Sequence, residues 1–282
     1  MTNGANHLSS AAAALVDNYP LLPARFAHAL ADHPLLTLDA LAEAALRLPA
    51  GSVERRVAQG DAGSEFAMLR GHLPQLDAHI RNPDALPCWI MLPRIERLPE
   101  YRELLQSIIA ETESTIAAAT GVIRDLSGFV FISAKGSVTP FHFDPEYNLF
   151  FQIAGDKRFA TFPASPPFVT DAVNEHYHMG GDNMLAWDSA QSHLGTVHDL
   201  QPGDGLYVPH KAPHWIEVGE QLSISLSLTW KSDWSQAEAY CHRFNGRLRQ
   251  WGIRPGPVAD WPAHAPLKTA GGRLLDRIGG LR

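Results

Sequence analysis

A histidine and an aspartate stand two residues apart near the middle of the chain, at positions 142 and 144, beside an apolar run. If this stretch is a strand, side chains two apart point to the same face, so His142 and Asp144 can grip one metal ion. Two ligands do not close a metal site, and His214, which follows a turn and a strand, is the best third candidate. Two histidines and one carboxylate leave adjacent positions open and suit non-haem Fe(II) oxygen chemistry.

Lys157 is a second candidate, because it stands just past a turn at the start of an alternating strand. If that strand lines a barrel, Lys157, Phe159 and Thr161 point inward. A buried ammonium without a partner is costly, so Lys157 either meets a carboxylate or binds an anionic ligand. The alternative is a lysine at a strand end with its ammonium in water. In the same way, His142 and Asp144 can be surface residues that flank a core strand.

Composition places limits on the partners of these residues. Among the 282 residues, 45% are hydrophobic and 19% charged, as in soluble globular proteins, and the net charge of -7 argues against a nucleic-acid surface. Cys88 and Cys241 cannot form a disulfide framework, so we expect a reducing, cytoplasmic setting. The longest apolar run near the start, 11–16, is far too short to cross a membrane and lacks the basic lead-in of a signal peptide.

The elements that must position the candidates fall into three regions. Residues 1–120 read as a mostly helical region packing on the core, 121–231 as a β-core, and 232–282 as a helical region with a tail. In the first region we expect helices at 11–18, 25–31 and 38–48, strands at 53–57 and 85–94, and one long amphipathic helix at 100–120.

The β-core shows many short strands with turn signals between them, which is typical of a sandwich or barrel. The clearest strand alternates large apolar and small hydroxyl residues from Leu222 to Trp230, so one face packs and the other is polar. A long excursion rich in Pro, Gly and Asn interrupts the core at 164–195. After the core we expect a helix at 232–251 and an extended tail at 252–274.

The order and spacing of the candidates form a longer signature. Its members are Thr139, Pro140, Phe141, His142, Phe143, Asp144, Asn148, Gln152, Gly155, Lys157 and Arg158, then Pro202, Gly203, Asp204, Tyr207, Val208, Pro209 and His214. This signature resembles the JmjC/cupin-like Fe(II)- and 2-oxoglutarate-dependent oxygenases over roughly 121–231. The nearest match is the branch with the asparaginyl hydroxylase that inhibits hypoxia-inducible factor, and its bacterial cupin-like relatives.

The resemblance implies an all-β core with flanking helices, folded as a double-stranded β-helix (jelly roll, cupin-like). It also implies that His142, Asp144 and His214 are the ligands of Fe(II). Lys157 would pair with the distal carboxylate of 2-oxoglutarate, helped by the hydroxyl of Thr139.

Two further residues follow from the same resemblance. The amide of Asn148 would approach the cosubstrate. Ser227 would take the place of an asparagine that the family often carries on its last barrel strand. An upstream tyrosine that the family uses has no clear counterpart in this sequence. C-terminal helices form a dimer in that branch, so we expect a homodimer.

The expected activity is hydroxylation of a protein side chain or small molecule, with succinate and CO2 as co-products. Two other readings stay open: a non-oxygenase cupin, such as a metal-dependent isomerase or binding protein, and a catalytically silent jelly roll that acts as a regulatory module. We expect no direct nucleic-acid or membrane partner.

Most of the 14 histidines need a simpler explanation than metal binding. His176 and His178 form a His-x-His pair but lack the surroundings of the ordinary cupin motif. We expect His193 and His198 to be exposed. His210, close to His214, reads either as a residue at the site's entrance or as a solvent-facing side chain.

Overall fold

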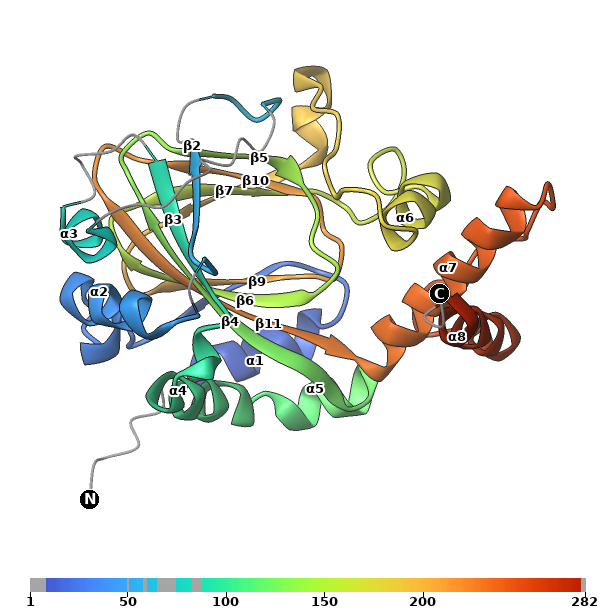
Figure 1. The fold of residues 1–282 in the computed structure, drawn as a ribbon, viewed down its shortest axis with the longest axis horizontal. Helices are drawn as coiled ribbons and strands as arrows, with labels where there is room; N and C mark the ends of the chain where they lie inside the picture. Colours follow the sequence, from blue (N-terminus) through green and yellow to red (C-terminus); the bar gives the residue numbers. More distant parts are fainter. Residues whose placement is uncertain (1–8, 50, 58–59, 65–74, 83–87, 280–282) are drawn as a thin grey trace.

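The computed structural model describes residues 9–49, 51–57, 60–64, 75–82 and 88–279. Two antiparallel sheets face each other across the molecule (Figure 1). The larger has the strand order β1 (Ala24–Ala27), β9 (Asp204–Val208), β6 (Tyr147–Ala154), β11 (Ser223–Ser232), β4 (Ile123–Ser133), β3 (Cys88–Pro93) and β2 (Glu54–Val57). The smaller has the order β5 (Val138–His142), β10 (His214–Val218), β7 (Lys157–Thr161) and β8 (Thr196–Leu200). The expected jelly roll with an all-β core is confirmed.

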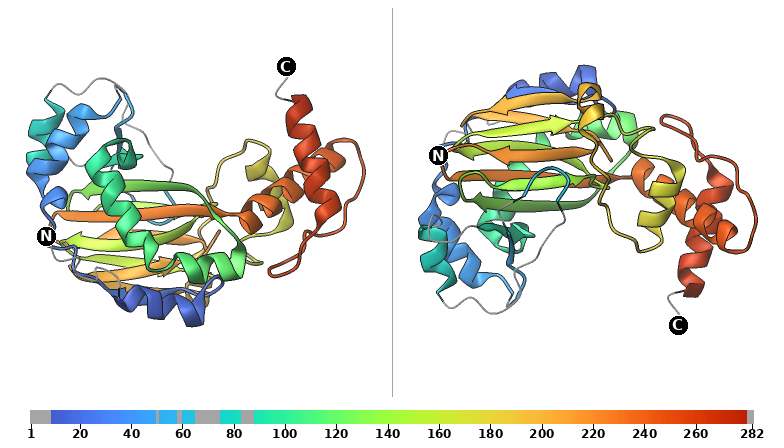
Figure 2. Two further views of the ribbon diagram at one scale, coloured as in Figure 1. Left: turned by 90° about the horizontal axis from the view of Figure 1, so that it is seen from below. Right: turned by 90° about the horizontal axis from the view of Figure 1, so that it is seen from above.

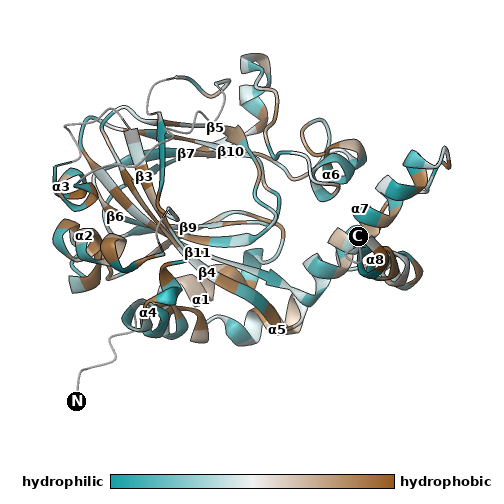
Figure 3. Cartoon of the chain, in the orientation of Figure 1, coloured by the Kyte–Doolittle hydropathy of each residue, from teal (hydrophilic) through white to brown (hydrophobic). Residues whose placement is uncertain are grey.

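The largest apolar core lies outside the barrel. Ile224, Leu226 and Leu228 of β11 are buried in one cluster with apolar residues of the N-terminal helices. The serines that alternate with them point to the other face, toward the smaller sheet. Figure 3 shows this alternation of hydrophobic and hydrophilic residues along the strands. Since the helices take up the apolar face of β11, its polar face is left for the space between the sheets.

The N-terminal helices pack along the outer face of the larger sheet and at its side (Figure 2). They are α1 (Ser9–Asn18), α2 (Leu38–Arg47), α3 (Leu76–Arg81), α4 (Pro99–Ala110) and α5 (Glu113–Thr120). Thr37 caps α2 through Oγ1, which accepts a hydrogen bond from the Ala40 N–H at 3.3 Å.

Two expectations for the N-terminal region are wrong. The segment expected as a helix at 25–31 contributes strand β1, the edge strand of the larger sheet, because its backbone pairs with β9. Helical propensity is a weak preference that such pairing overrides. The single helix expected at 100–120 is two helices, α4 and α5, separated at residues 111 and 112.

The remaining helices lie beyond one end of the barrel. They are α6 (Asp171–His178) within the long excursion, α7 (Asp233–Gln250), which continues directly from β11, and α8 (Pro266–Gly279). The excursion also holds a short 3-10 helix, η4 (Ser189–Leu194). An extended tail to residue 274 was expected, and this is wrong for α8, which packs along α7. Within the described segments, no helix is long and apolar enough to cross a membrane.

Candidate metal centre and anion pocket

The pairing of β5 with β10 brings the three predicted ligands together. His142 ends β5 and His214 begins β10, and the two are directly opposed in the antiparallel register. Asp144 lies in the loop two residues past β5, not on the strand as the spacing suggested. Its Oδ1 is 3.8 Å from His142 Nε2, and its Oδ2 is 3.7 Å from His214 Nε2. The ligand atoms of all three residues lie within 4.8 Å of one another.

The two imidazoles have the state that a metal needs. His142 Nδ1 lies 2.7 Å from the Pro140 carbonyl oxygen, and His214 Nδ1 lies 2.9 Å from that of Ala212. Donation from each Nδ1–H leaves the lone pair on Nε2, facing Asp144. Burial lowers the pKa of both histidines to about 4, so both are neutral at pH 7. Two neutral imidazoles and a carboxylate fit a divalent cation.

The long excursion supports the carboxylate ligand. Asn183 Nδ2 donates to the Phe143 carbonyl oxygen at 2.6 Å and lies 3.4 Å from Asp144 Oδ1. The backbone N–H of Phe143 in turn donates to the Asn183 carbonyl oxygen at 3.2 Å. This part of the excursion therefore holds the loop of Asp144 in place.

Lys157 lies deeper in the barrel and is buried, with an exposed fraction of 4%. Its Nζ donates to Ser225 Oγ at 2.7 Å and lies 5.5 Å from the centre of the Phe150 ring. No carboxylate of the described residues lies within ion-pair distance of Nζ, and burial lowers the pKa of Lys157 to about 7. Such an ammonium fits an anionic ligand.

The other predicted cosubstrate residues line the same cavity, which measures about 250 Å³. Asn148 on β6 donates through Nδ2 to Ser227 Oγ on β11 at 3.2 Å. Thr139 lies opposite Ile216 in the β5–β10 pairing. The structure thus brings all seven predicted site residues to one cavity: His142, Asp144, His214, Thr139, Asn148, Lys157 and Ser227. Their roles as ligands of metal and cosubstrate stay predictions.

Sequence reasoning missed other residues of this site. Ser225 is the hydrogen-bond partner of Lys157, and the hydroxyl alternation of β11 already marked its face. Arg56 and Trp89 also line the cavity, with the guanidinium 5.5 Å from the indole ring. They come from β2 and β3, which no motif connected with the site.

Two expectations for single histidines need correction. His198 is buried and its Nε2 lies 3.0 Å from Thr161 Oγ1, so Thr161 meets this histidine instead of the metal cavity. The side chain of His210 is 8% exposed, and it lies neither at the cavity wall nor in solvent. Among the residues that the structure describes, His176 and His178 join no metal-binding group.

Comparison with known proteins adds one relative of moderate identity. No protein-family model matches the sequence. Over 122 residues the chain is 34% identical to the Jumonji C domain-containing protein 5 of Drosophila melanogaster. The matched stretch makes up 38% of this chain and 29% of that protein, so the chain spans less than a third of its relative.

Solved structures give a match over nearly the whole chain. The X-ray structure of E. coli ycfD superposes with a TM-score of 0.54 at 15% identity, covering 96% of this chain and 68% of that one. This chain has the fold of the JmjC/cupin-like oxygenases. A second structure, E. coli YcfD described as a ribosomal oxygenase in complex with cobalt and 2-oxoglutarate, gives a TM-score of 0.51 at 14% identity, over 98% and 67% of the two chains. Placement in the asparaginyl hydroxylase branch stays a prediction.

Proposed function

We propose that this chain is an Fe(II)- and 2-oxoglutarate-dependent oxygenase that hydroxylates a protein side chain. The observation that carries this proposal is the convergence of His142, Asp144, His214 and Lys157 on one cavity. At one end the three potential metal ligands can hold a cation, and at the other end Lys157 can hold an anion. A metal ion chelated by a cosubstrate with two carboxylates requires both.

Different side chains would bind the metal and the cosubstrate. When bound, Fe(II), 2-oxoglutarate and oxygen supply the oxidising power that turns a C–H into a C–OH bond, with succinate and CO2 as co-products. His142 and His214 would hold the metal through Nε2, and Asp144 through a carboxylate oxygen. Lys157 would hold a carboxylate of 2-oxoglutarate with its ammonium, which Ser225 already orients.

The walls of the cavity strengthen this arrangement. Phe131, Phe150 and Phe159 line the cavity, and the rings of Phe131 and Phe150 lie 6.0 and 5.5 Å from Lys157 Nζ. An ion pair between an ammonium and a carboxylate gains strength in such an apolar, low-dielectric setting. Thr139 and Asn148 offer a hydroxyl and an amide as further hydrogen-bond partners for the cosubstrate.

A protein substrate is favoured by the comparisons. The solved neighbour is described as a ribosomal oxygenase, and the relative from Drosophila melanogaster carries a Jumonji C domain in its name. A small-molecule substrate was the other expectation, and the assay below distinguishes the two by which addition stimulates turnover.

The test measures succinate formed with Fe(II), 2-oxoglutarate and oxygen, alone, with candidate proteins and with candidate small molecules. We expect turnover for the wild type, and loss of at least about 100-fold for Asp144→Ala, since the carboxylate ligand is removed. Asp199→Ala is the matched control, because this exposed aspartate lies on β8 outside the cavity. Binding of Co(II) and of 2-oxoglutarate is measured in parallel by calorimetry.

The same data test the two other readings. Binding of Co(II) and an organic acid without succinate formation indicates a non-oxygenase cupin. Absence of both kinds of binding in the wild type indicates a silent jelly roll and overturns the proposal.

We also propose that the protein is a cytoplasmic homodimer whose catalytic core is 121–231, with 1–120 and 232–282 packed around it. Leu267, Leu274 and Ile278 of α8 are 87%, 58% and 56% exposed, which supports a partner for this helix. We expect Leu274→Glu to lower the mass measured by light scattering to that of a monomer. Leu46→Glu, at another exposed leucine, is the control. An unchanged mass for Leu274→Glu contradicts a dimer through α8.

A further inference from the structure

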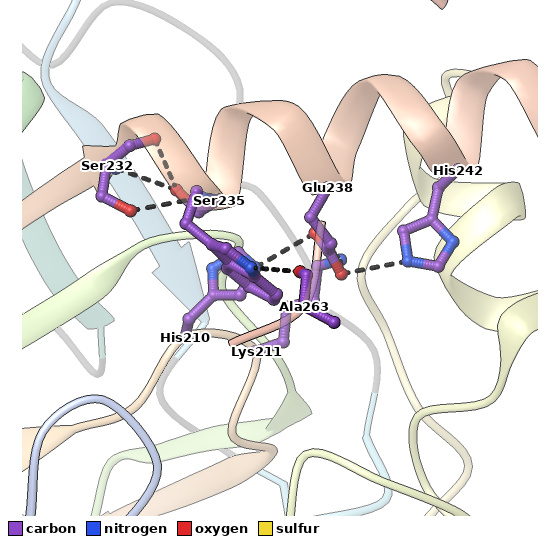
Figure 4. A network of polar contacts seen from close by, with 8 residues as sticks. His210, Lys211, Ser232, Ser235, Glu238, His242 and Ala263 are labelled. Carbon is purple, nitrogen blue, oxygen red and sulfur yellow. Dashed lines mark hydrogen bonds and ion pairs between the residues drawn. The ribbon is translucent and has the colours of Figure 1, made fainter. Parts of the chain in front are cut away.

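A buried carboxylate on α7, that of Glu238, is surrounded by three donors (Figure 4). Lys211 Nζ lies 2.5 Å from Oε1 and 2.7 Å from Oε2. His242 Nε2 lies 3.0 Å from Oε1, and His210 Nε2 lies 3.3 Å from Oε2. The Glu238 side chain is only 9% exposed and that of Lys211 4%. None of these four side chains lines the metal cavity.

The charges of this network have a consistent assignment. Burial by itself raises the pKa of Glu238, but the Lys211 ammonium and the two imidazole donors outweigh it and hold the pKa well below its usual range. The Nδ1 atoms of His210 and His242 have no hydrogen-bond partner among the described residues. Burial lowers the pKa of His210, which can therefore be a neutral Nε2–H donor, and Lys211 places a full positive charge opposite Glu238.

Lys211 connects this network to two of the predicted metal ligands. Its backbone N–H donates to the carbonyl oxygen of Asp144 at 3.0 Å. The next residue, Ala212, accepts the hydrogen bond from His214 Nδ1 at 2.9 Å. The turn at 211–214 therefore contacts Asp144 through one residue and orients His214 through the next.

The backbone of Lys211 has an unfavourable conformation that its contacts must hold in place. Its φ is +60°, in the left-handed region that glycine adopts without strain and a lysine does not. A strained backbone of this kind persists only where the surroundings hold it. Here the ammonium is held by a carboxylate on a helix that begins where β11 ends, and Ser232 and Ser235 cap that helix with reciprocal hydrogen bonds (Figure 4).

We propose that Glu238 is a positioning residue for the metal centre, acting through Lys211 on the turn that orients Asp144 and His214. The part of this inference that concerns the metal rests on the proposed function. The part that concerns the turn stands on the geometry alone, so the two can fail separately.

The experiment compares Glu238→Gln with Glu175→Gln. Glu175 is a matched control, because it is also a buried carboxylate in an ion pair with α7, with Oε2 2.5 Å from Arg249 Nε, but it does not contact the turn. We expect Glu238→Gln to raise the Kd for Co(II) about 10-fold and to speed amide hydrogen exchange in peptides covering 208–216. Glu175→Gln changes neither.

A double variant separates positioning from general stability. Lys211→Met with Glu238→Gln removes the buried unpaired ammonium that Glu238→Gln alone creates, so Tm recovers toward the wild-type value. The ion pair between Glu238 and Lys211 is still missing in the double variant. We therefore expect its Co(II) affinity to stay weak and its amide exchange at 208–216 to stay fast. Recovery of Tm, affinity and slow exchange together overturns the proposal.

The remaining outcomes are also decisive. Wild-type exchange at 208–216 in folded Glu238→Gln overturns the inference, as does an equal effect of Glu175→Gln. If the wild type binds no Co(II), the proposed function fails. In that case amide hydrogen exchange at 208–216 alone tests whether Glu238 positions the turn. Faster exchange in Glu238→Gln than in Glu175→Gln supports this role.

Discussion

The ammonium of Lys157 on β7 reaches across the barrel to the hydroxyl of Ser225 on β11, with 2.7 Å between Nζ and Oγ. The two residues belong to different sheets, so this hydrogen bond spans the space between them. A neutral hydroxyl replaces only part of the hydration that a buried ammonium loses. A bound carboxylate would therefore stabilise the buried ammonium of Lys157.

Lys157→Met should stabilise the ligand-free protein while abolishing 2-oxoglutarate binding. The pKa of Lys157 is lowered by burial from 10.5 to about 7. Below pH 7 the folded wild type keeps a buried ammonium, so the stability advantage of the variant is greatest there, on the order of 5 kcal/mol. The advantage shrinks as pH rises from 7 to 10.5, because the folded wild type loses this proton first. Urea unfolding at pH 6.5, 8 and 9.5 measures it.

The control for that variant is Lys135→Met, which removes an exposed lysine outside the cavity. We expect its stability to match the wild type at each pH. Wild-type 2-oxoglutarate affinity in Lys157→Met contradicts the assigned role of Lys157.

Binding of 2-oxoglutarate should weaken above neutral pH. A carboxylate needs the protonated form of Lys157, whose pKa in the free protein is about 7. Below pH 7, Lys157 already carries this proton. Above pH 7, Lys157 must take up a proton when 2-oxoglutarate binds, so the Kd rises up to about 10-fold per pH unit. Calorimetry with Co(II) in buffers of different ionisation enthalpy measures this uptake. Lys157→Arg keeps its charge, so a slope as steep as that of the wild type in this variant refutes the explanation.

Asn148 should matter more to the cosubstrate than Ser227. They share a hydrogen bond of 3.2 Å that uses one N–H of Asn148 Nδ2, so its second N–H can donate to an oxygen of 2-oxoglutarate. A lost amide hydrogen bond costs about 1 kcal/mol, so we expect Asn148→Ala to raise the Kd for 2-oxoglutarate about 5-fold. Ser227→Ala should change it less than 2-fold, and Asn174→Ala, at a buried asparagine on α6, not at all. Equal effects of Asn148→Ala and Ser227→Ala would show that the pair acts as one unit.

Gly155 forms the turn that introduces Lys157, and an alanine there should be costly. Its φ is +65°, and an added Cβ would overlap the carbonyl oxygen of Leu222. Gly136 has the same φ but nothing within 4 Å of an added Cβ. We expect Gly136→Ala to cost about 1 kcal/mol of unfolding free energy, and Gly155→Ala more than about 3 kcal/mol. Chemical denaturation measures both, and similar losses contradict the steric explanation.

Local pattern in the sequence predicted much of the fold. Alternation from Leu222 to Trp230 predicted β11, and the capping position of Thr37 predicted the start of α2. The types and spacing of His142 and Asp144 predicted that the two share a site, and their ligand atoms do lie close together, whereas metal binding stays a prediction. The predictions of β11 and α2 succeed because side-chain alternation and helix capping depend on residues a few positions apart. Helix propensity gave the wrong prediction at residues 25–31, because pairing with β9 makes part of this segment a strand.

What the tertiary structure alone decided is which distant side chains meet. Alternation on β11 marked the polar face that carries Ser225, yet only the packing of the two sheets sets Lys157 against it, 68 positions away in sequence. Likewise, nothing local connects Lys211 with Glu238, 27 positions apart, or makes Asn183 a support for Asp144. A strand's period determines which face a side chain occupies, whereas register and sheet packing determine what it faces.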